Sequence, residues 1–82
     1  MELNKIEVTG EHKHLQIKEI TDEGGYHRRV LTPDMDVSGE TQTIQRGTDE
    51  NGDPIMKTVK EIAEELWTDE VKASWATFQA EQ

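Results

Sequence analysis

The sequence contains no cysteine, so the chain forms neither disulfide bonds nor thiolate metal sites. No segment approaches the roughly 20 apolar residues that a transmembrane helix needs, and the N-terminus lacks the apolar run of a secretory signal. Aromatic residues are also scarce, at 5% of the chain, so few side chains supply large apolar contacts. We therefore expect a soluble, non-exported protein that packing and hydrogen bonds hold together.

Apolar residues are few as well. They make up 32% of the chain against 33% charged residues, which places it at the low-hydrophobicity edge of globular proteins. We expect residues 1–82 to form one small domain, and a domain of this size buries only about 60% of its unfolded surface. Its stability should be marginal, and a partner or a second copy would raise it.

Negative charge dominates, with a net charge of −9. Residues 1–32 hold five Lys/Arg and six Asp/Glu, whereas residues 33–82 hold four and twelve. A field of that sign repels phosphate backbones, so we expect no direct nucleic-acid binding. The acidic half forms either a solvated surface or a face that docks on a basic protein.

Alternating apolar and polar residues in 4–9, 14–21 and 26–32 predict a meander of three antiparallel strands. A turn centred on Glu23-Gly24 fixes the expected register of the last two strands. The core side would then hold the pairs Leu15–Thr32, Ile17–Val30 and Glu19–Arg28. The other side would hold Gln16–Leu31, Lys18–Arg29 and Ile20–His27. Because the Lys18–Arg29 pair is repulsive, this second face should be exposed to solvent or to an acidic partner.

Pro33 ends the sheet after Thr32, since proline lacks a backbone donor and favours an extended preceding residue. A structured loop follows, with Met35 and Val37 as its apolar anchors. Asn-Gly at 51–52, between polar segments 41–48 and 54–57, predicts a second hairpin. Its arms hold few apolar residues, so we expect it to project from the domain or to pair with a partner.

Two helices should complete the chain. Thr58 and Glu61 fit a capping box, and the following apolar stripe is amphipathic: Val59, Ile62, Ala63 and Leu66. Thr68 caps a second helix from Asp69 to about Ala80. The break at residues 67–68 implies a helical corner that folds over the sheet. The predicted class is α+β, with a β-meander (1–32), a loop and hairpin (33–57) and a helical corner (58–82).

Two patterns resemble metal sites. His12 and His14 alternate at ligand spacing, but the expected register keeps His27 far from them, so a three-histidine zinc site is disfavoured. They are either surface histidines beside a turn or a pair completed by another chain. Residues 49–53 resemble the opening of an EF-hand loop, but their glycine is fourth rather than sixth and Lys60 replaces the bidentate glutamate. A hairpin turn is the better interpretation.

No pattern of catalysis is recognisable. Ser38, Ser74 and the threonines lack a nucleophile elbow and a histidine-plus-acid arrangement, and the Gly-Gly and Ser-Gly pairs are too short for a phosphate-binding loop. We therefore expect a protein that is not an enzyme and uses no cofactor or metal.

Three of the four aromatic residues lie in the last 16 residues: Trp67, Trp75 and Phe78. Each can serve the core, but tryptophan is also enriched at binding hot spots. We favour Trp75 as a partner-binding anchor, because a terminal helix is the element most easily offered outward.

Several motifs occur in a fixed order: Tyr-His-Arg-Arg-Val-Leu-Thr-Pro from Tyr26, Asp-Met-Asp-Val-Ser-Gly-Glu from Asp34, Leu-Trp-Thr from Leu66 and Asp-Glu-Val from Asp69. Their order resembles small proteins of tailed bacteriophages that are encoded among tail and tail-fibre genes. The resemblance covers residues 15–40 and 62–78. Segment 42–56 is longer than the usual spacer of that family, so the hairpin has no assigned role.

The resemblance implies a minor structural protein of the tail, baseplate or fibre, located in the virion after assembly in the host cytoplasm. Its partners would be other tail or fibre proteins in a symmetric oligomeric assembly, with no membrane. The matching positions that it points to are His27, Arg28, Arg29, Pro33, Asp36, Ser38, Gly39, Trp67 and Thr68. Together with Trp75 and Phe78, we take His27, Arg29, Asp36, Ser38 and Trp67 as candidate partner-binding residues.

Two alternatives remain open. The first is a fibre-assembly factor that is absent from the mature particle. The second is a small acidic inhibitor that mimics nucleic acid to block a host defence enzyme, which the net charge of −9 suggests. The salt dependence of binding distinguishes such an inhibitor from a tail subunit, because binding through a mimicked phosphate array weakens steeply as ionic strength rises.

Overall fold

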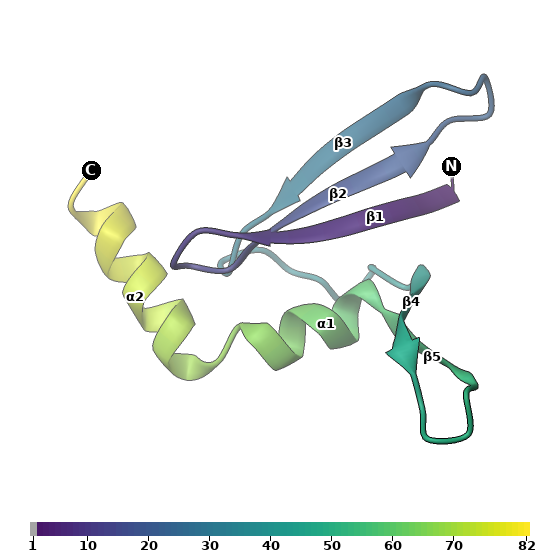
Figure 1. The fold of residues 1–82 in the computed structure, drawn as a ribbon. Helices are drawn as coiled ribbons and strands as arrows, with labels where there is room; N and C mark the ends of the chain where they lie inside the picture. The colour runs from purple at the N-terminus through teal and green to yellow at the C-terminus, as the bar shows by residue number, and fades with distance from the viewer. Residues whose placement is uncertain (1) are drawn as a thin grey trace.

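A computed structural model describes residues 2–82, which form a three-stranded sheet, a separate hairpin and two helices (Figure 1). The elements in chain order are β1 (Glu2–Thr9), β2 (His14–Ile20), β3 (Tyr26–Leu31), β4 (Thr43–Thr48), β5 (Pro54–Thr58), α1 (Val59–Leu66) and α2 (Asp69–Ala80). The sheet orders are β1-β2-β3 and β4-β5, all antiparallel. The α+β prediction is confirmed. No helix within residues 2–82 is long and apolar enough to cross a membrane.

The register of β2 with β3 differs from the expected one by one residue. The observed pairs are Leu15–Leu31, Gln16–Val30, Ile17–Arg29, Lys18–Arg28, Glu19–His27 and Ile20–Tyr26. A one-residue slip moves every side chain of a strand to the other face. Leu31 is therefore buried and Val30 is 43% exposed, and Arg29 rather than Arg28 lies beside Glu19. The predicted core pairs with Val30, Thr32 and Arg28 were wrong.

The loop between β2 and β3 explains the slip. Thr21 N donates to Gly25 O at 2.9 Å and Gly24 N donates to Thr21 O at 3.0 Å, which leaves three residues in the loop instead of two. Gly24 has φ 84°, the left-handed conformation that closes three-residue hairpin loops. An odd loop length shifts the pairing by one position relative to the two-residue turn expected from Glu23-Gly24.

The second hairpin is present and uses the same turn. Asp49 N donates to Asp53 O at 2.9 Å, Gly52 N donates to Asp49 O at 3.0 Å, and Gly52 has φ 82°. In both turns, the side chain of the residue before the three-residue loop accepts a hydrogen bond from the backbone amide of the residue after it. Thr21 Oγ1 accepts from Gly25 N and Asp49 Oδ1 accepts from Asp53 N, each at 3.0 Å. The hairpin projects from the rest of the molecule, away from the three-stranded sheet (Figure 1).

The core lies between one face of the three-stranded sheet and α1 (Figure 1). The sheet contributes Ile6, Leu15, Ile17 and Leu31, and the helical side contributes Val59, Ile62, Ala63 and Trp67. The apolar stripe of the sequence therefore faces the sheet, as its period of 3.6 residues requires. Trp67 is 4% exposed, and its Nε1 donates to the Lys13 carbonyl at 2.6 Å, which fastens the β1–β2 turn to the helical corner.

Both helix starts follow the local signals. Thr58 Oγ1 accepts from Glu61 N at 3.0 Å and Thr58 N donates to Glu61 Oε1 at 3.1 Å, a complete capping box. Thr68 Oγ1 accepts from Val71 N at 3.3 Å at the start of α2. No residue of α2 is fully buried, so this helix is attached through partly buried side chains alone.

The loop after β3 begins where Pro33 predicts, since β3 ends at Leu31. Val37 is partly buried against the core, but Met35 is 45% exposed and is not an anchor. Met35 N donates to Thr32 O at 3.0 Å, so Pro33 and Asp34 occupy the centre of a turn, and the Met35 side chain folds back over this turn, where its sulfur accepts from Thr32 N at 3.5 Å.

Candidate binding surface

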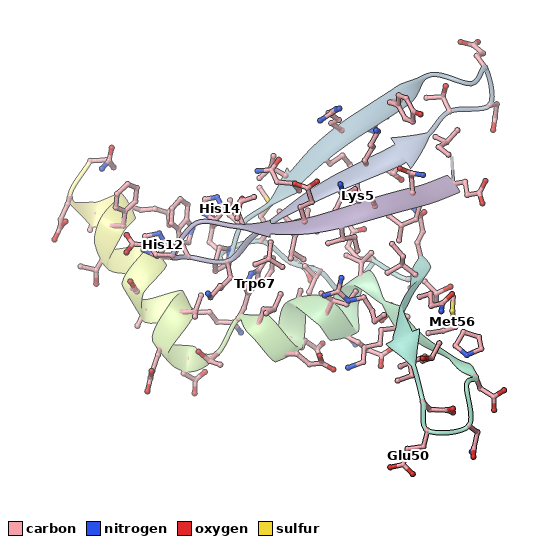
Figure 2. The ribbon with its side chains drawn as sticks, in the orientation of Figure 1. Lys5, His12, His14, Glu50, Met56 and Trp67 are labelled. Atoms are coloured by element: carbon pink, nitrogen blue, oxygen red, sulfur yellow. The ribbon has the colours of Figure 1, made fainter. Side chains whose placement is uncertain are left out.

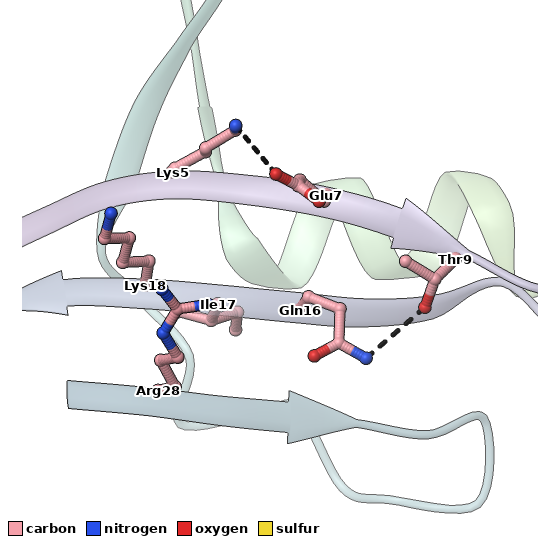
Figure 3. Close-up of a pocket in the computed structure, with 7 residues that line it drawn as sticks. All are labelled: Lys5, Glu7, Thr9, Gln16, Ile17, Lys18 and Arg28. Atoms are coloured by element: carbon pink, nitrogen blue, oxygen red, sulfur yellow. Dashed lines mark hydrogen bonds and ion pairs between the residues drawn. The ribbon is translucent and has the colours of Figure 1, made fainter. Parts of the chain in front are cut away.

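The three-stranded sheet has an open face, on the side away from α1. Alternation along the strands puts on this side Lys5, Glu7 and Thr9 of β1, Gln16, Lys18 and Ile20 of β2, and Tyr26, Arg28 and Val30 of β3. Six of the residues line a pocket, together with Ile17 (Figure 3). The expectation that this face is exposed and mixed holds, with Arg28 rather than Arg29 opposite Lys18.

A row of three cations crosses the middle of the open face. Lys18 is the cross-strand partner of Lys5 on one side and of Arg28 on the other, as Figure 3 shows. We call these three residues the cationic row. Like charges that face each other across strands are destabilising, so the fold bears a cost in placing them together. Such a local conflict is typical of a functional surface.

Little within the chain neutralises the cationic row. Lys5 Nζ pairs with Glu7 Oε1 at 2.7 Å, and Lys18 Nζ lies 3.9 Å from the centroid of the Tyr26 ring, a cation–π contact. Within residues 2–82, neither Lys18 nor Arg28 pairs with a carboxylate. The hydrogen bond and charge of Lys5, with smaller contributions from Arg28 and Lys18, hold the pKa of Glu7 below its usual range. The surface is thus suited to bind carboxylates.

Two predicted site residues, His27 and Arg29, lie on the other face of the sheet, in a polar cluster around Glu19. Glu19 is 3% exposed and is contacted by Arg29 Nε at 2.9 Å, Gln42 Nε2 at 3.0 Å and His27 Nδ1 at 3.4 Å. The hydrogen bond from Gln42, and then those from Arg29 and His27, hold the pKa of Glu19 below its usual range despite burial.

Arg29 also joins this cluster to the loop before β4. Its two terminal nitrogens donate to the two carboxylate oxygens of Glu40 at 2.8 and 3.0 Å, a bidentate pair of fixed geometry. The hydrogen bond from Arg29 lowers the pKa of Glu40. Arg29 is thus engaged inside the chain, and its role in partner binding, like that of His27, stays a prediction.

The predicted pair Asp36 and Ser38 lies in the same loop. Asp36 Oδ1 accepts from Ser38 N at 2.9 Å, a local turn that holds the pKa of Asp36 below its usual range. Both side chains are exposed, but neither lies on the open face of the sheet. Their contact with a partner also stays a prediction.

His12 and His14, at the β1–β2 turn, pack against α2, as Figure 2 shows. Trp75 lies 5.3 Å from the His12 ring and 4.7 Å from the His14 ring, and Phe78 lies 5.3 Å from His12, between centroids. His12 is only 8% exposed, so its interpretation as a surface residue was wrong. Within residues 2–82 no group of three possible ligands could hold a metal ion.

The predicted aromatic anchors are therefore engaged to different degrees. Trp67 belongs to the core. Trp75 is partly buried, and its Nε1 donates to Asp34 Oδ1 at 2.6 Å, which ties α2 to the turn after β3. Phe78 is the most exposed of the three. Of these three side chains, Phe78 is therefore the one most accessible to a partner.

Two opposed cations were expected on this face, but as Lys18 with Arg29 rather than with Arg28, and Lys5 was not expected beside them because β1 had no predicted register. The one signal available was the register, which depends on turn geometry that the sequence pattern did not resolve.

No protein-family model, no curated protein and no solved structure matches this chain. The resemblance to tail-associated phage proteins therefore rests on the sequence motifs alone. The open face is the candidate binding surface on the strength of its charges and its exposure.

Proposed function

We propose that the protein is a non-enzymatic structural component of a bacteriophage tail, baseplate or fibre, and that it acts by protein–protein contact. The observation that supports this proposal best is spatial: the two stretches of the resemblance, 15–40 and 62–78, contact each other. Trp75 of the second stretch donates to Asp34 of the first, and within the first stretch Arg29 binds Glu40 through two hydrogen bonds.

These contacts give the motifs a common role as the framework of the fold. Trp67, in the Leu-Trp-Thr motif, fills the core and binds the Lys13 carbonyl, and Thr68 of that motif caps α2. Residues that hold one framework together are the ones that proteins of the same fold would share. The contacts thus support treating the matching residues as one folded unit rather than as unrelated short motifs.

The segment outside the motifs, 42–56, forms most of the projecting β4–β5 hairpin. Projecting loops and hairpins vary between related proteins and carry their specific contacts. β1 and β3 are also edge strands of the sheet, and edge strands can accept a strand from another chain. A shared framework with a variable projection and open edges fits a small protein that joins larger neighbours.

Mass spectrometry of purified particles from the phage that encodes this chain tests the proposal. We expect its peptides at a fixed ratio to a tail protein of known copy number, through gradient purification and through washes at raised salt. A phage protein known to be absent from particles serves as the control for contamination. Peptides found only in the infected-cell lysate would overturn the structural role and favour an assembly factor or an inhibitor of a host enzyme.

A further inference from the structure

Contacts within residues 2–82 engage the cationic row only in part, through Lys5 with Glu7 and Lys18 with the Tyr26 ring. Three of the nine Lys and Arg residues of this acidic protein lie side by side on the open face of the sheet. Two of them, Lys18 and Arg28, have no carboxylate partner within residues 2–82. The neighbouring Gln16 and Thr9 are neutral and bind each other at 3.4 Å. The one carboxylate in the pocket, that of Glu7, is already held by Lys5.

A group of complementary charge stands at the tip of the β4–β5 hairpin, which carries Asp49, Glu50 and Asp53. All three residues are exposed, and none forms an ion pair within residues 2–82. Oδ1 of Asp49 accepts from the amides of Asn51 and Asp53 at 2.9 and 3.0 Å, so the turn is ordered by its own hydrogen bonds. We call these three residues the acidic tip.

The row and the tip of one molecule do not meet. Figure 2 shows Lys5 on the three-stranded sheet and Glu50 at the far end of the projecting hairpin. The hairpin extends on the α1 side of the sheet (Figure 1). The cationic row faces away from α1, because it alternates along the strands with the core residues that face this helix. Two copies can bring the charges together, because each copy presents one row and one tip.

We infer that the acidic tip of one copy docks on the cationic row of a second copy. Three carboxylates then face three cations, and Arg28 offers the planar fork that binds a carboxylate with two hydrogen bonds. The contact is head-to-tail, because the two surfaces that meet are different. Such contacts build rings or filaments rather than closed two-fold dimers.

The strength of the contact follows from its exposure. Ion pairs at an open surface contribute little each, so a single contact between two free copies is weak and salt-dependent. The net charge of −9 on each copy opposes approach, but at about 0.15 M salt this repulsion is screened beyond roughly 8 Å while the close pairs persist. Copies that a larger assembly holds close together associate far more strongly.

Charge-reversed variants test the contact. The row variant is Lys18→Glu with Arg28→Glu, and the tip variant is Glu50→Lys with Asp53→Lys, which leaves Asp49 in place to hold the turn. ¹⁵N-labelled tip variant is titrated with unlabelled row variant to millimolar concentration at about 0.1 M salt. Each variant alone brings like charges together and should show no concentration-dependent shifts. The mixture should restore association, with amide shifts at residues 5, 18 and 28 of the labelled protein.

A matched control and a change of salt sharpen the result. Lys72→Glu makes the same substitution as Lys18→Glu on the exposed side of α2, and it should leave self-association of the otherwise native chain unchanged, whereas Lys18→Glu should weaken it at least several-fold. Raising the salt to about 0.5 M should also weaken the complex of the two variants at least several-fold, because salt screens the ion pairs. Dispersed amide spectra establish that each variant is folded. Neutral Glu50→Gln with Asp53→Asn replaces the tip variant, and neutral Lys18→Gln with Arg28→Gln replaces the row variant, where the charge-reversed form is not folded.

Three results would overturn the inference. The first is an unchanged spectrum of the mixture at millimolar concentration, and the second is a set of shifts that excludes the cationic row. The third is binding of a glutamate-rich peptide or a DNA oligonucleotide to the row when a second copy does not bind, because the occupant is then a different molecule. The association does not depend on the proposed place in a tail, so a protein absent from particles can still pass this test.

Discussion

Replacing Arg29 by alanine removes the side chain that joins the sheet to the loop before β4. Arg29 donates to Glu19 at 2.9 Å and to both oxygens of Glu40 at 2.8 and 3.0 Å. Glu19 would remain in the protein interior, where only 4% of its side chain is exposed, with hydrogen bonds from Gln42 and His27 alone. A buried carboxylate that loses its cation is costly, because burial removes the water that would otherwise solvate the charge.

The expected loss in the free energy of unfolding follows from these contacts. Removing one partner of a fully buried ion pair costs about 3–5 kcal/mol. The side chain of Arg29 is 30% exposed, and Glu19 keeps two other contacts, so we expect a loss of about 2–3 kcal/mol. An 82-residue domain has a free energy of unfolding of about 4–12 kcal/mol, and each kcal/mol lowers the melting temperature by about 4–8 °C. The variant should therefore melt at least about 8 °C lower.

Arg28→Ala is the matched control, because it removes the same side chain one residue away on the opposite face. Arg28 faces Lys18, so its removal relieves repulsion and should change the free energy of unfolding by less than about 0.5 kcal/mol. Urea unfolding followed by tryptophan fluorescence measures both variants. Equal losses, or a larger loss for Arg28→Ala, would refute the observed register of β3 and with it the assignment of Arg28 to the open face.

Three further predictions concern the caps, the pH dependence and α2. Thr58→Ala should destabilise the protein by about 1 kcal/mol in urea unfolding, because it removes the capping box, whereas Thr77→Ala on exposed α2 should cause no loss; equal effects would contradict the role of the cap. Glu19 and Glu40 have folded-state pKa values below the usual 4.5, so their stabilisation is complete above that pH and is lost as pH falls through the lower folded pKa values. Melting temperatures from pH 7 to 3 should fall in the acid range, less steeply in Glu40→Gln; a flat profile would count against the cluster. Amides of α2 should exchange hydrogen faster than those of α1, since no α2 residue is fully buried, and the reverse order would show that α2 is held by more than its aromatic contacts.

The helices and their caps could be predicted from the sequence because their signals are local. The Thr58–Glu61 box spans four residues, and the apolar stripe of α1 repeats within two turns, so no distant contact is needed to recognise them. The start of α2 after Thr68 is equally local. The end of β3 before Pro33 follows from the missing donor of proline.

The register of β3 could not be predicted, because it depends on one residue of loop length. Glu23-Gly24 fits a two-residue turn and Asp22-Glu23-Gly24 fits a three-residue turn, and the strand pattern Val30-Leu31 offers an apolar residue to either face. The choice between the two turns depends on packing in the folded sheet, because the register that buries Leu31 also brings Arg29 beside Glu19. The one-residue error also put Arg29 in place of Arg28 opposite Lys18 on the open face.

The packing of α2 against the β1–β2 turn could not be predicted from the sequence either. His12 and Ser74 are 62 residues apart in the sequence, and neither periodicity nor spacing links the β1–β2 turn to the last helix. The pairing of Trp75 with His14 and Asp34 arises from the angle of the helical corner at Trp67-Thr68, which tertiary packing determines.

The central claim is that the protein works by contact and that the open face of its sheet is a contact surface. Lysine reactivity tests it most directly: acetylation rates are measured by mass spectrometry for the isolated chain and for the chain within purified particles. We predict that Lys5 and Lys18 become protected in particles while Lys72, on the exposed side of α2, reacts at an unchanged rate. Lys5 and Lys18 that react as fast in particles as in the isolated chain would contradict the claim.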